Sequence, residues 1–97
     1  MNTYIILLNY TDQGIRTASE SPERFARSQQ EARSFGCEVK AFYATLGAYD
    51  FVEVIEAPDD ASIAKLVLSV GAAGNVRTTT IKAFTESEFK KIAQGIK

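Results

Sequence analysis

The sequence predicts an α+β protein with a ferredoxin-like βαββαβ core, a four-stranded antiparallel sheet and a C-terminal helix. Apolar runs typical of strands alternate with segments whose apolar residues recur at helical spacing. The second and third strand-like runs are separated only by a short turn, so they are expected to pair antiparallel. Right-handed crossovers then place the first and third strands at the centre. We expect a single domain, residues 1–97.

The expected strands cover residues 4–10, 38–46, 50–57 and 76–84. The first is apolar on both faces, which is typical of a central strand covered on both sides. The second and third are expected to join through a tight turn at Gly47 and Ala48. The fourth is rich in threonine and tolerates an edge position.

Two helices are expected between these strands. In the first, Ser21 is the expected N-cap, Pro22 suits the first helical position and Gly36 ends the helix. The second is expected to be capped by Asp59 or Asp60. Its apolar residues have the i, i+3, i+4, i+7 spacing of a helix that packs on a sheet: Ile63, Leu66, Val67 and Val70.

The C-terminal helix has the clearest local signals. Thr85 and Glu88 have the spacing of a capping box, in which each side chain bonds to the other residue's backbone N–H. The residues that follow form one apolar face: Phe89, Ile92, Ala93 and Ile96.

Composition excludes several classes of function. Hydrophobic residues make up 45% of the chain, charged residues 24%, and the net charge is −1, so no basic face is expected for nucleic acid. The absence of histidine excludes Ser-His-Asp triads, His-ligated zinc and a proximal haem histidine. We expect no metal and no cofactor. Cys37 is the only cysteine, and the first residues lack the pattern of a signal peptide or membrane span, so we expect a cytoplasmic protein without membrane contact.

A homodimer is predicted from the sheet. One helical layer covers one face only, and the other face carries either Ile6, Leu8, Phe51 and Ile55 or their neighbours of opposite parity. Either set leaves an open apolar surface, which usually marks an interface. We therefore expect two copies to pack sheet against sheet about a two-fold axis, as a dimer or within a larger homo-oligomer.

The segment Gly47-Ala48-Tyr49-Asp50 after a strand resembles the Gly-x-Tyr-Asp signature of the GYD domain family. Further segments match in order along nearly the whole chain, among them 4–11, 21–24, 40–43, 56–60 and 74–78. The resemblance implies a small protein of unassigned function with a fold similar to dimeric α/β-barrel proteins. That superfamily includes cofactor-free monooxygenases, lactone isomerases, haem-degrading enzymes and amino-acid-sensing regulator domains, and fold analogy does not select among them.

Tyr49 and Asp50 are the first candidate ligand-binding residues. They could orient a ligand at the mouth of a cavity between two sheets. In the structural alternative, which we favour, Asp50 accepts hydrogen bonds from backbone N–H groups in its turn. Tyr49 then packs its ring against the protein while its hydroxyl stays in contact with water. Tyr10 and Tyr43 could contribute hydroxyl groups to an apolar pocket. More often, such tyrosines belong to the core and only one edge of the ring is in contact with water.

Two charged residues complete the set of candidates. Arg77 could clamp a ligand carboxylate, but we favour a structural pairing with Asp50, Glu53 or Glu56. Glu53 lies mid-strand between apolar neighbours; facing a cavity it would be a candidate general base, and facing solvent it would be structural.

Three functions remain open from the sequence. The first is a small dimeric α/β protein that binds a small organic ligand in a pocket between or beside the sheets. The second is an enzyme similar to cofactor-independent monooxygenases or isomerases, with Glu53 or Asp50 as the base and Arg77 or a tyrosine hydroxyl as the stabilising group. The third is an assembly scaffold without chemistry.

Overall fold

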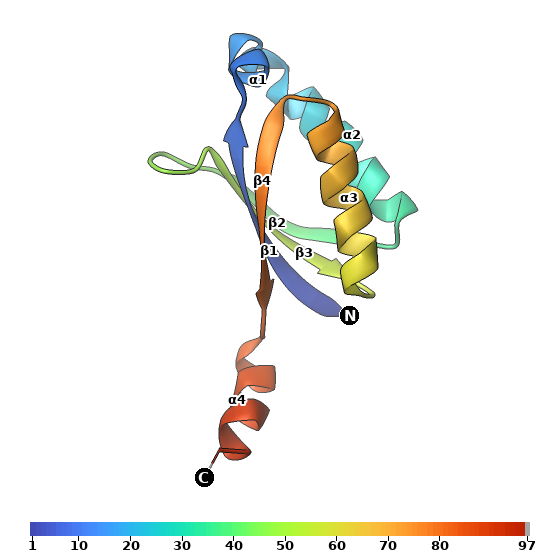
Figure 1. Ribbon diagram of the computed structural model, residues 1–97, viewed down its shortest axis with the longest axis vertical. Coiled ribbons are helices and arrows are strands. Elements are labelled where there is room, and N and C mark those ends of the chain that lie inside the picture. Colours follow the sequence, from blue (N-terminus) through green and yellow to red (C-terminus); the bar gives the residue numbers. More distant parts are fainter. Residues whose placement is uncertain (97) are drawn as a thin grey trace.

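The computed structural model describes residues 1–96 and confirms the ferredoxin-like fold (Figure 1). The sheet has the strand order β2-β3-β1-β4 with every pair antiparallel, so the first and third strands lie at the centre as predicted. The elements are β1 (Asn2–Tyr10), α1 (Asp12–Arg16), a 3₁₀ turn (Ala18–Glu20), α2 (Ser21–Ser34), β2 (Glu38–Ala44), β3 (Phe51–Ala57), α3 (Asp60–Ala72), β4 (Val76–Ala83) and α4 (Glu86–Gln94).

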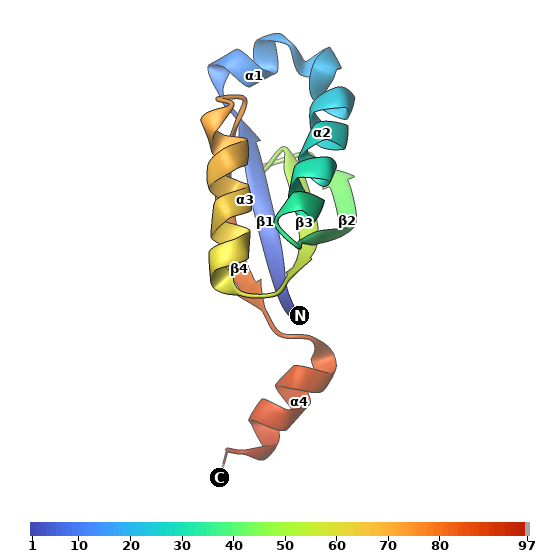
Figure 2. The same ribbon diagram turned by 90° about the vertical axis from the view of Figure 1, so that its right-hand side faces the viewer.

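Helices α2 and α3 lie side by side over one face of the sheet (Figure 2). We call this the helix face. Alternate residues of β1 point into it and are buried, whereas the residues between them point to the opposite, open face. The core beneath the helices consists of Tyr4, Ile6, Leu8, Ala32, Cys37, Ile55, Ala57, Ile63 and Leu66. The sequence left open which of the two alternating sets of residues faces the helices. The structure shows that the set containing Ile6 and Leu8 does.

A β-bulge in β2 decides which of its side chains face the helices. The pairing register shifts between Val39 and Ala41, which leaves Lys40 as the extra residue. Val39 lies opposite Ile55, and Phe42 lies opposite Glu53, so both point to the helix face. Without this bulge, Phe42 could not share a face with Val39.

The β2–β3 connection is wider than the predicted tight turn. β2 ends at Ala44 and β3 begins at Phe51, so the loop occupies residues 45–50. The Thr45 N–H donates to the Asp50 carbonyl oxygen at 2.8 Å, and the Thr45 hydroxyl donates to the Tyr49 carbonyl oxygen at 2.6 Å. Thr45 thus joins the two ends of the loop. Within the loop, Gly47 has a backbone φ of +107°, a conformation that glycine adopts without strain.

The predicted helix caps are confirmed at two of three helices. Asp59 caps α3 by accepting the Ser62 N–H at 2.8 Å, and the capping box of α4 is formed by Thr85 and Glu88. The prediction for α2 is wrong, because the preceding 3₁₀ turn runs directly into the helix and makes Ser21 its first residue. The Ser21 hydroxyl instead lies 2.6 Å from the hydroxyl of Tyr10.

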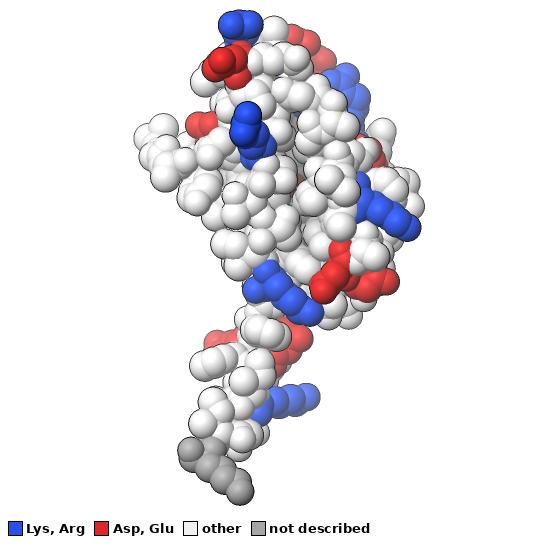
Figure 3. Space-filling model, in the orientation of Figure 1, with Lys and Arg blue, Asp and Glu red and all other residues white. Residues whose placement is uncertain are grey.

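Helix α4 extends away from the body formed by the sheet, α2 and α3 (Figures 1 and 2). Its apolar side chains, and those of the residues just before and after it, are consequently exposed: Phe84, Phe89, Ile92 and Ile96. Figure 3 shows acidic and basic side chains mixed on the face it presents, without an extended patch of one sign. No helix within residues 1–96 has the length and apolarity needed to cross a membrane.

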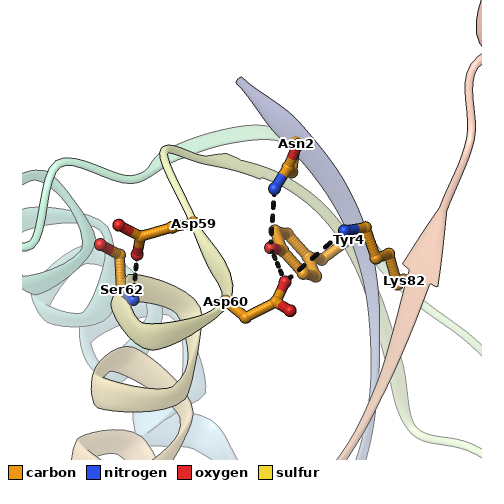
Figure 4. A network of polar contacts seen from close by, with 6 residues as sticks. All are labelled: Asn2, Tyr4, Asp59, Asp60, Ser62 and Lys82. Carbon is orange, nitrogen blue, oxygen red and sulfur yellow. Dashed lines mark hydrogen bonds and ion pairs between the residues drawn. The ribbon is translucent and has the colours of Figure 1, made fainter.

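A polar cluster anchors the start of α3 to the sheet (Figure 4). The Tyr4 hydroxyl donates to Asp60 Oδ1 at 2.5 Å, and Lys82 Nζ of β4 lies 3.8 Å from the same oxygen. Burial raises the pKa of Tyr4, and the hydrogen bond to Asp60 raises it further. Tyr4 therefore stays a neutral donor, and the cluster links β1, β4 and α3.

Candidate functional site

A cavity of about 240 Å³ lies between α2, α3 and the helix face of the sheet. Its apolar wall is formed by aromatic side chains from β1, α2, β2 and β3: Tyr10, Phe25, Phe42 and Phe51. The rings of Phe25 and Phe42 stack with centroids 3.8 Å apart, and the Tyr10 ring meets Phe51 edge-on at 5.1 Å. These contacts fix the wall of the cavity.

Glu53 supplies a buried carboxyl group to this cavity. It lies opposite Ile6 in the sheet register, points to the helix face and is only 8% exposed. Desolvation raises the pKa of Glu53 to about 7, and within residues 1–96 no hydrogen bond or cation opposes this shift. Every fully enclosed side-chain nitrogen or oxygen in the described chain has a partner, so the unpartnered Glu53 oxygens are not fully enclosed. Glu53 lines both this cavity and a smaller one of about 20 Å³ beneath the same helices.

The mouth of the cavity is polar. The Ser69 hydroxyl of α3 donates to Glu31 Oε1 of α2, which ties the two helices together. Arg24 donates to the Gly14 carbonyl oxygen at 3.1 Å and also to the Thr17 hydroxyl, so its guanidinium is held at the N-terminal side of α2. Arg27 is exposed and adds positive charge at the mouth.

The structure separates the candidate residues that the sequence suggested. Tyr10 and Glu53 line the cavity, whereas Tyr43 and Arg77 belong to the open face. Glu53 and Arg77 thus lie on opposite faces of the sheet and do not form one site within a single copy. Within one copy, this cavity lies beneath the helices, on the face of the sheet opposite to the one where a second sheet was expected to pack.

Tyr49 and Asp50 lie in the β2–β3 loop. Asp50 Oδ2 accepts the backbone N–H of Tyr10 at 2.8 Å, and the Asp50 N–H donates to the Leu8 carbonyl oxygen at 2.9 Å. Asp50 therefore fastens the loop to the end of β1, next to the tyrosine that forms part of the cavity wall. Tyr49 is 37% exposed.

The sequence reasoning missed Phe25, Phe42 and the mouth residues as parts of a site. Phe25 gave no signal beyond being an apolar side chain in the first expected helix. A signal existed for Phe42, because a residue opposite Glu53 in the β2–β3 hairpin must share its face. Because the bulge at Lys40 adds one residue to β2, counting alternate residues from Val39 places Phe42 on the wrong face.

The arrangement can bind a hydrogen-bond donor or a cation at Glu53, while the rings hold an apolar group. Glu53 could also accept a proton, provided that a substrate places an acidic C–H or O–H within reach. Within residues 1–96, no group of three His, Cys, Asp or Glu side chains could hold a metal ion.

Comparison with known proteins identifies the family. The model of the GYD domain matches residues 4–93. This chain belongs to the GYD domain family. The GYD signature itself, Gly47 to Asp50, thus forms the loop that fastens the β2–β3 hairpin to β1.

A relative of this GYD domain protein comes from Thermus thermophilus. It is 45% identical to this chain over 84 residues, which are 86% of this chain and 88% of the relative, and it is named a glutamine synthetase and cystathionine beta-lyase binding protein. Its name describes a protein that binds enzymes.

Solved structures of two regulators share the fold of this GYD domain. The leucine response regulatory protein of Mycobacterium tuberculosis matches with a TM-score of 0.65 and 15% identity over 87% of this chain and 51% of the regulator. A feast or famine regulatory protein of M. tuberculosis, in complex with L-methionine, matches with a TM-score of 0.67 and 15% identity over 88% of this chain and 51% of its own. The chain spans about half the length of each regulator, and the likeness shows the fold alone.

Proposed function

We propose that this GYD domain protein is a binding protein that assembles with a second copy of itself and associates with a metabolic enzyme. The observation that carries the proposal is the open face of the sheet, which no element within residues 1–96 covers. In the register, Ile5 lies opposite Val54 and Ile81, and Leu7 lies opposite Val52. The apolar side chains of the open face are Ile5, Leu7, Ala41, Tyr43, Val52, Val54, Ile81 and Ala83.

The size of this surface suits a second copy that also covers α4. Four strands of about eight residues span roughly 19 Å by 26 Å, or on the order of 500 Å². A stable interface buries about 800 Å² on each partner. Helix α4 continues from β4 at the edge of this face and adds its exposed Phe89 and Ile92, and Ile96, which follows the helix, is exposed as well. The proposed dimer therefore uses both surfaces.

The enzyme-binding part of the proposal is supported by the relative that is 45% identical and is named for binding glutamine synthetase and cystathionine beta-lyase. A similar partner would place the protein in the cytoplasm. The free, buried thiol of Cys37 agrees with that location, since disulfides are rare there.

The dimer is tested by placing a charge on the open face. Leu7→Asp and Ile81→Asp should each weaken self-association at least about 30-fold, because burying an unpaired carboxylate costs about 2 kcal/mol or more. Light scattering coupled to size exclusion at micromolar concentration should show a dimer for the wild-type protein and monomers for both variants.

The matched control for this experiment is Leu68→Asp, which makes the same change at a leucine of α3 that is 72% exposed. It should remain dimeric, and circular dichroism should show that all three variants keep the fold. A monomeric wild-type protein, or an Ile81→Asp variant as dimeric as the wild type, would contradict the proposed interface.

Enzyme binding is tested separately by biolayer interferometry with glutamine synthetase and cystathionine beta-lyase from the same organism as this chain. We expect saturable binding of at least one of them, with no response from an unrelated enzyme of similar size and charge. If neither enzyme binds the wild-type dimer, this part of the proposal is wrong, whatever the oligomeric state.

A second candidate function is the binding of a small organic molecule in the cavity beneath the helices. It is favoured by Glu53, a buried carboxyl group that has no partner within residues 1–96 and lines an aromatic cavity. The oxygenase or isomerase alternative would use the same cavity, with Glu53 as the base. Arg77 would not stabilise that reaction within one copy, since it lies on the open face.

A further inference from the structure

We propose that the cavity beneath α2 and α3 binds a small organic amine, with its ammonium group against the Glu53 carboxylate and its apolar body among the rings of Tyr10, Phe25, Phe42 and Phe51. The inference rests on the second candidate function, small-molecule binding, and names the chemical class of the ligand.

The charge of the ligand follows from the surroundings of Glu53. A buried carboxylate is costly unless a cation or several donors compensate it, and residues 1–96 provide neither. Arg24 is held by Gly14 and Thr17, and exposed Arg27 lies at the mouth. A ligand ammonium would supply the missing partner through charge-assisted hydrogen bonds. A ligand carboxylate in the same place would meet Glu53 with like charge.

The aromatic wall also favours a cation with an apolar body. Ammonium groups are attracted to the faces of aromatic rings within about 6 Å, and the attraction increases when water is excluded. The ring contacts run from Tyr10 through Phe51 and Phe42 to Phe25, so the wall is continuous along one side of the cavity. Apolar ligand surface that packs against these rings is removed from water, which favours binding.

The volume limits the ligand to a small metabolite. The cavity of about 240 Å³ is just below the range of about 300–1,000 Å³ that is typical for drug-sized ligands. The hydrogen bond between Ser69 and Glu31 joins α3 to α2 at the mouth and limits how far the helices can separate. A single aromatic ring with a short aminoalkyl chain matches this space.

Three probes of nearly equal shape test the ligand class: phenethylamine, 2-phenylethanol and 3-phenylpropionate. They differ in whether the end of the chain is a cation, a neutral hydroxyl or an anion. Calorimetric titration of the full-length protein at pH 8, where the amine is protonated and Glu53 is mostly ionised, should show phenethylamine binding at least tenfold more tightly than either other probe.

Glu53→Gln is the test variant, because it keeps the shape of the side chain and removes the charge. It should weaken phenethylamine binding at least tenfold and leave binding of the alcohol within about threefold. Glu56→Gln is the matched control, since Glu56 lies on the same strand and points to the opposite face of the sheet. It should bind phenethylamine like the wild type, and thermal unfolding should show that both variants are folded.

The outcomes separate the ligand class from the underlying function. Tighter binding of the alcohol or the acid, or unchanged amine binding by Glu53→Gln, would overturn the amine proposal but preserve small-molecule binding in the cavity. Failure of all three probes to bind the wild-type protein would contradict both. Neither result affects the test of the dimer, which concerns the opposite face of the sheet.

Discussion

Replacing Glu53 with glutamine should raise the free energy of unfolding by up to about 3 kcal/mol at pH 8 and leave it nearly unchanged at pH 4.5. Burial raises the pKa of Glu53 from 4.5 to about 7 in the folded protein. Each pH unit of such a shift corresponds to about 1.4 kcal/mol. The buried carboxylate of the wild-type protein therefore opposes folding whenever it is ionised.

The pH dependence has a definite sign. Between pH 4.5 and 7 the folded protein holds a proton at Glu53 that the unfolded chain has lost, so stability falls as the pH rises through this window. Below the window the wild-type protein has no penalty, and above it the penalty is complete. Desolvation alone accounts for the raised pKa of Glu53, so the charged groups at the mouth (Arg24, Arg27 and Glu31) do not change this expectation.

Urea unfolding of the wild type and Glu53→Gln between pH 4.5 and 8, at one fixed protein concentration, measures this difference. Glu23→Gln is the control, because Glu23 is exposed on α2, away from both the cavity and the open face; it should follow the wild type throughout. Parallel curves for the wild type and Glu53→Gln across the whole range would show that Glu53 is not desolvated in the folded protein. Phenethylamine at saturating concentration should reduce the gap at pH 8, because it stabilises only the wild type strongly.

Replacing Gly14 with alanine should destabilise the fold by about 3 kcal/mol. Gly14 is the buried residue of α1, and a Cβ built on it would lie 2.8 Å from the carbonyl carbon of Asn75 and would collide with its oxygen. That oxygen accepts the Thr11 N–H at 3.1 Å, so the backbone of the α3–β4 loop cannot move aside without losing the bond. Overpacking of this kind typically costs about 1–3 kcal/mol, and the lost bond adds to it.

Gly71→Ala is the control for this prediction. Gly71 lies inside α3 with open space where its Cβ would be, so alanine there should stabilise the protein by about 0.5–1 kcal/mol. Urea unfolding at pH 7 and one protein concentration compares the two variants. Similar effects of both substitutions would show that α1 does not pack closely against residues 74 and 75.

Local signals in the sequence were sufficient for the elements and their order. Helical spacing of apolar residues marked α2 and α3, and the side chains of Asp59, Thr85 and Glu88 marked two helix starts by completing hydrogen bonds within one turn. These interactions join residues close together in the chain, which is why the sequence reveals them. The N-cap prediction for Ser21 was wrong because its hydroxyl forms a hydrogen bond with the hydroxyl of Tyr10, a residue of another element.

The chain by itself determined that a βαββαβ sheet would form with β1 and β3 at its centre, because alternation and helical spacing are local patterns. Only the tertiary structure decided that Glu53 points beneath the helices, that Arg77 lies on the other face, and that α4 extends from the body. The physical reason is that a shift of one residue in a strand exchanges its two faces at little local cost. Which face a strand residue occupies depends on the packing of α2 and α3 and on the bulge at Lys40. Both depend on contacts between distant parts of the chain.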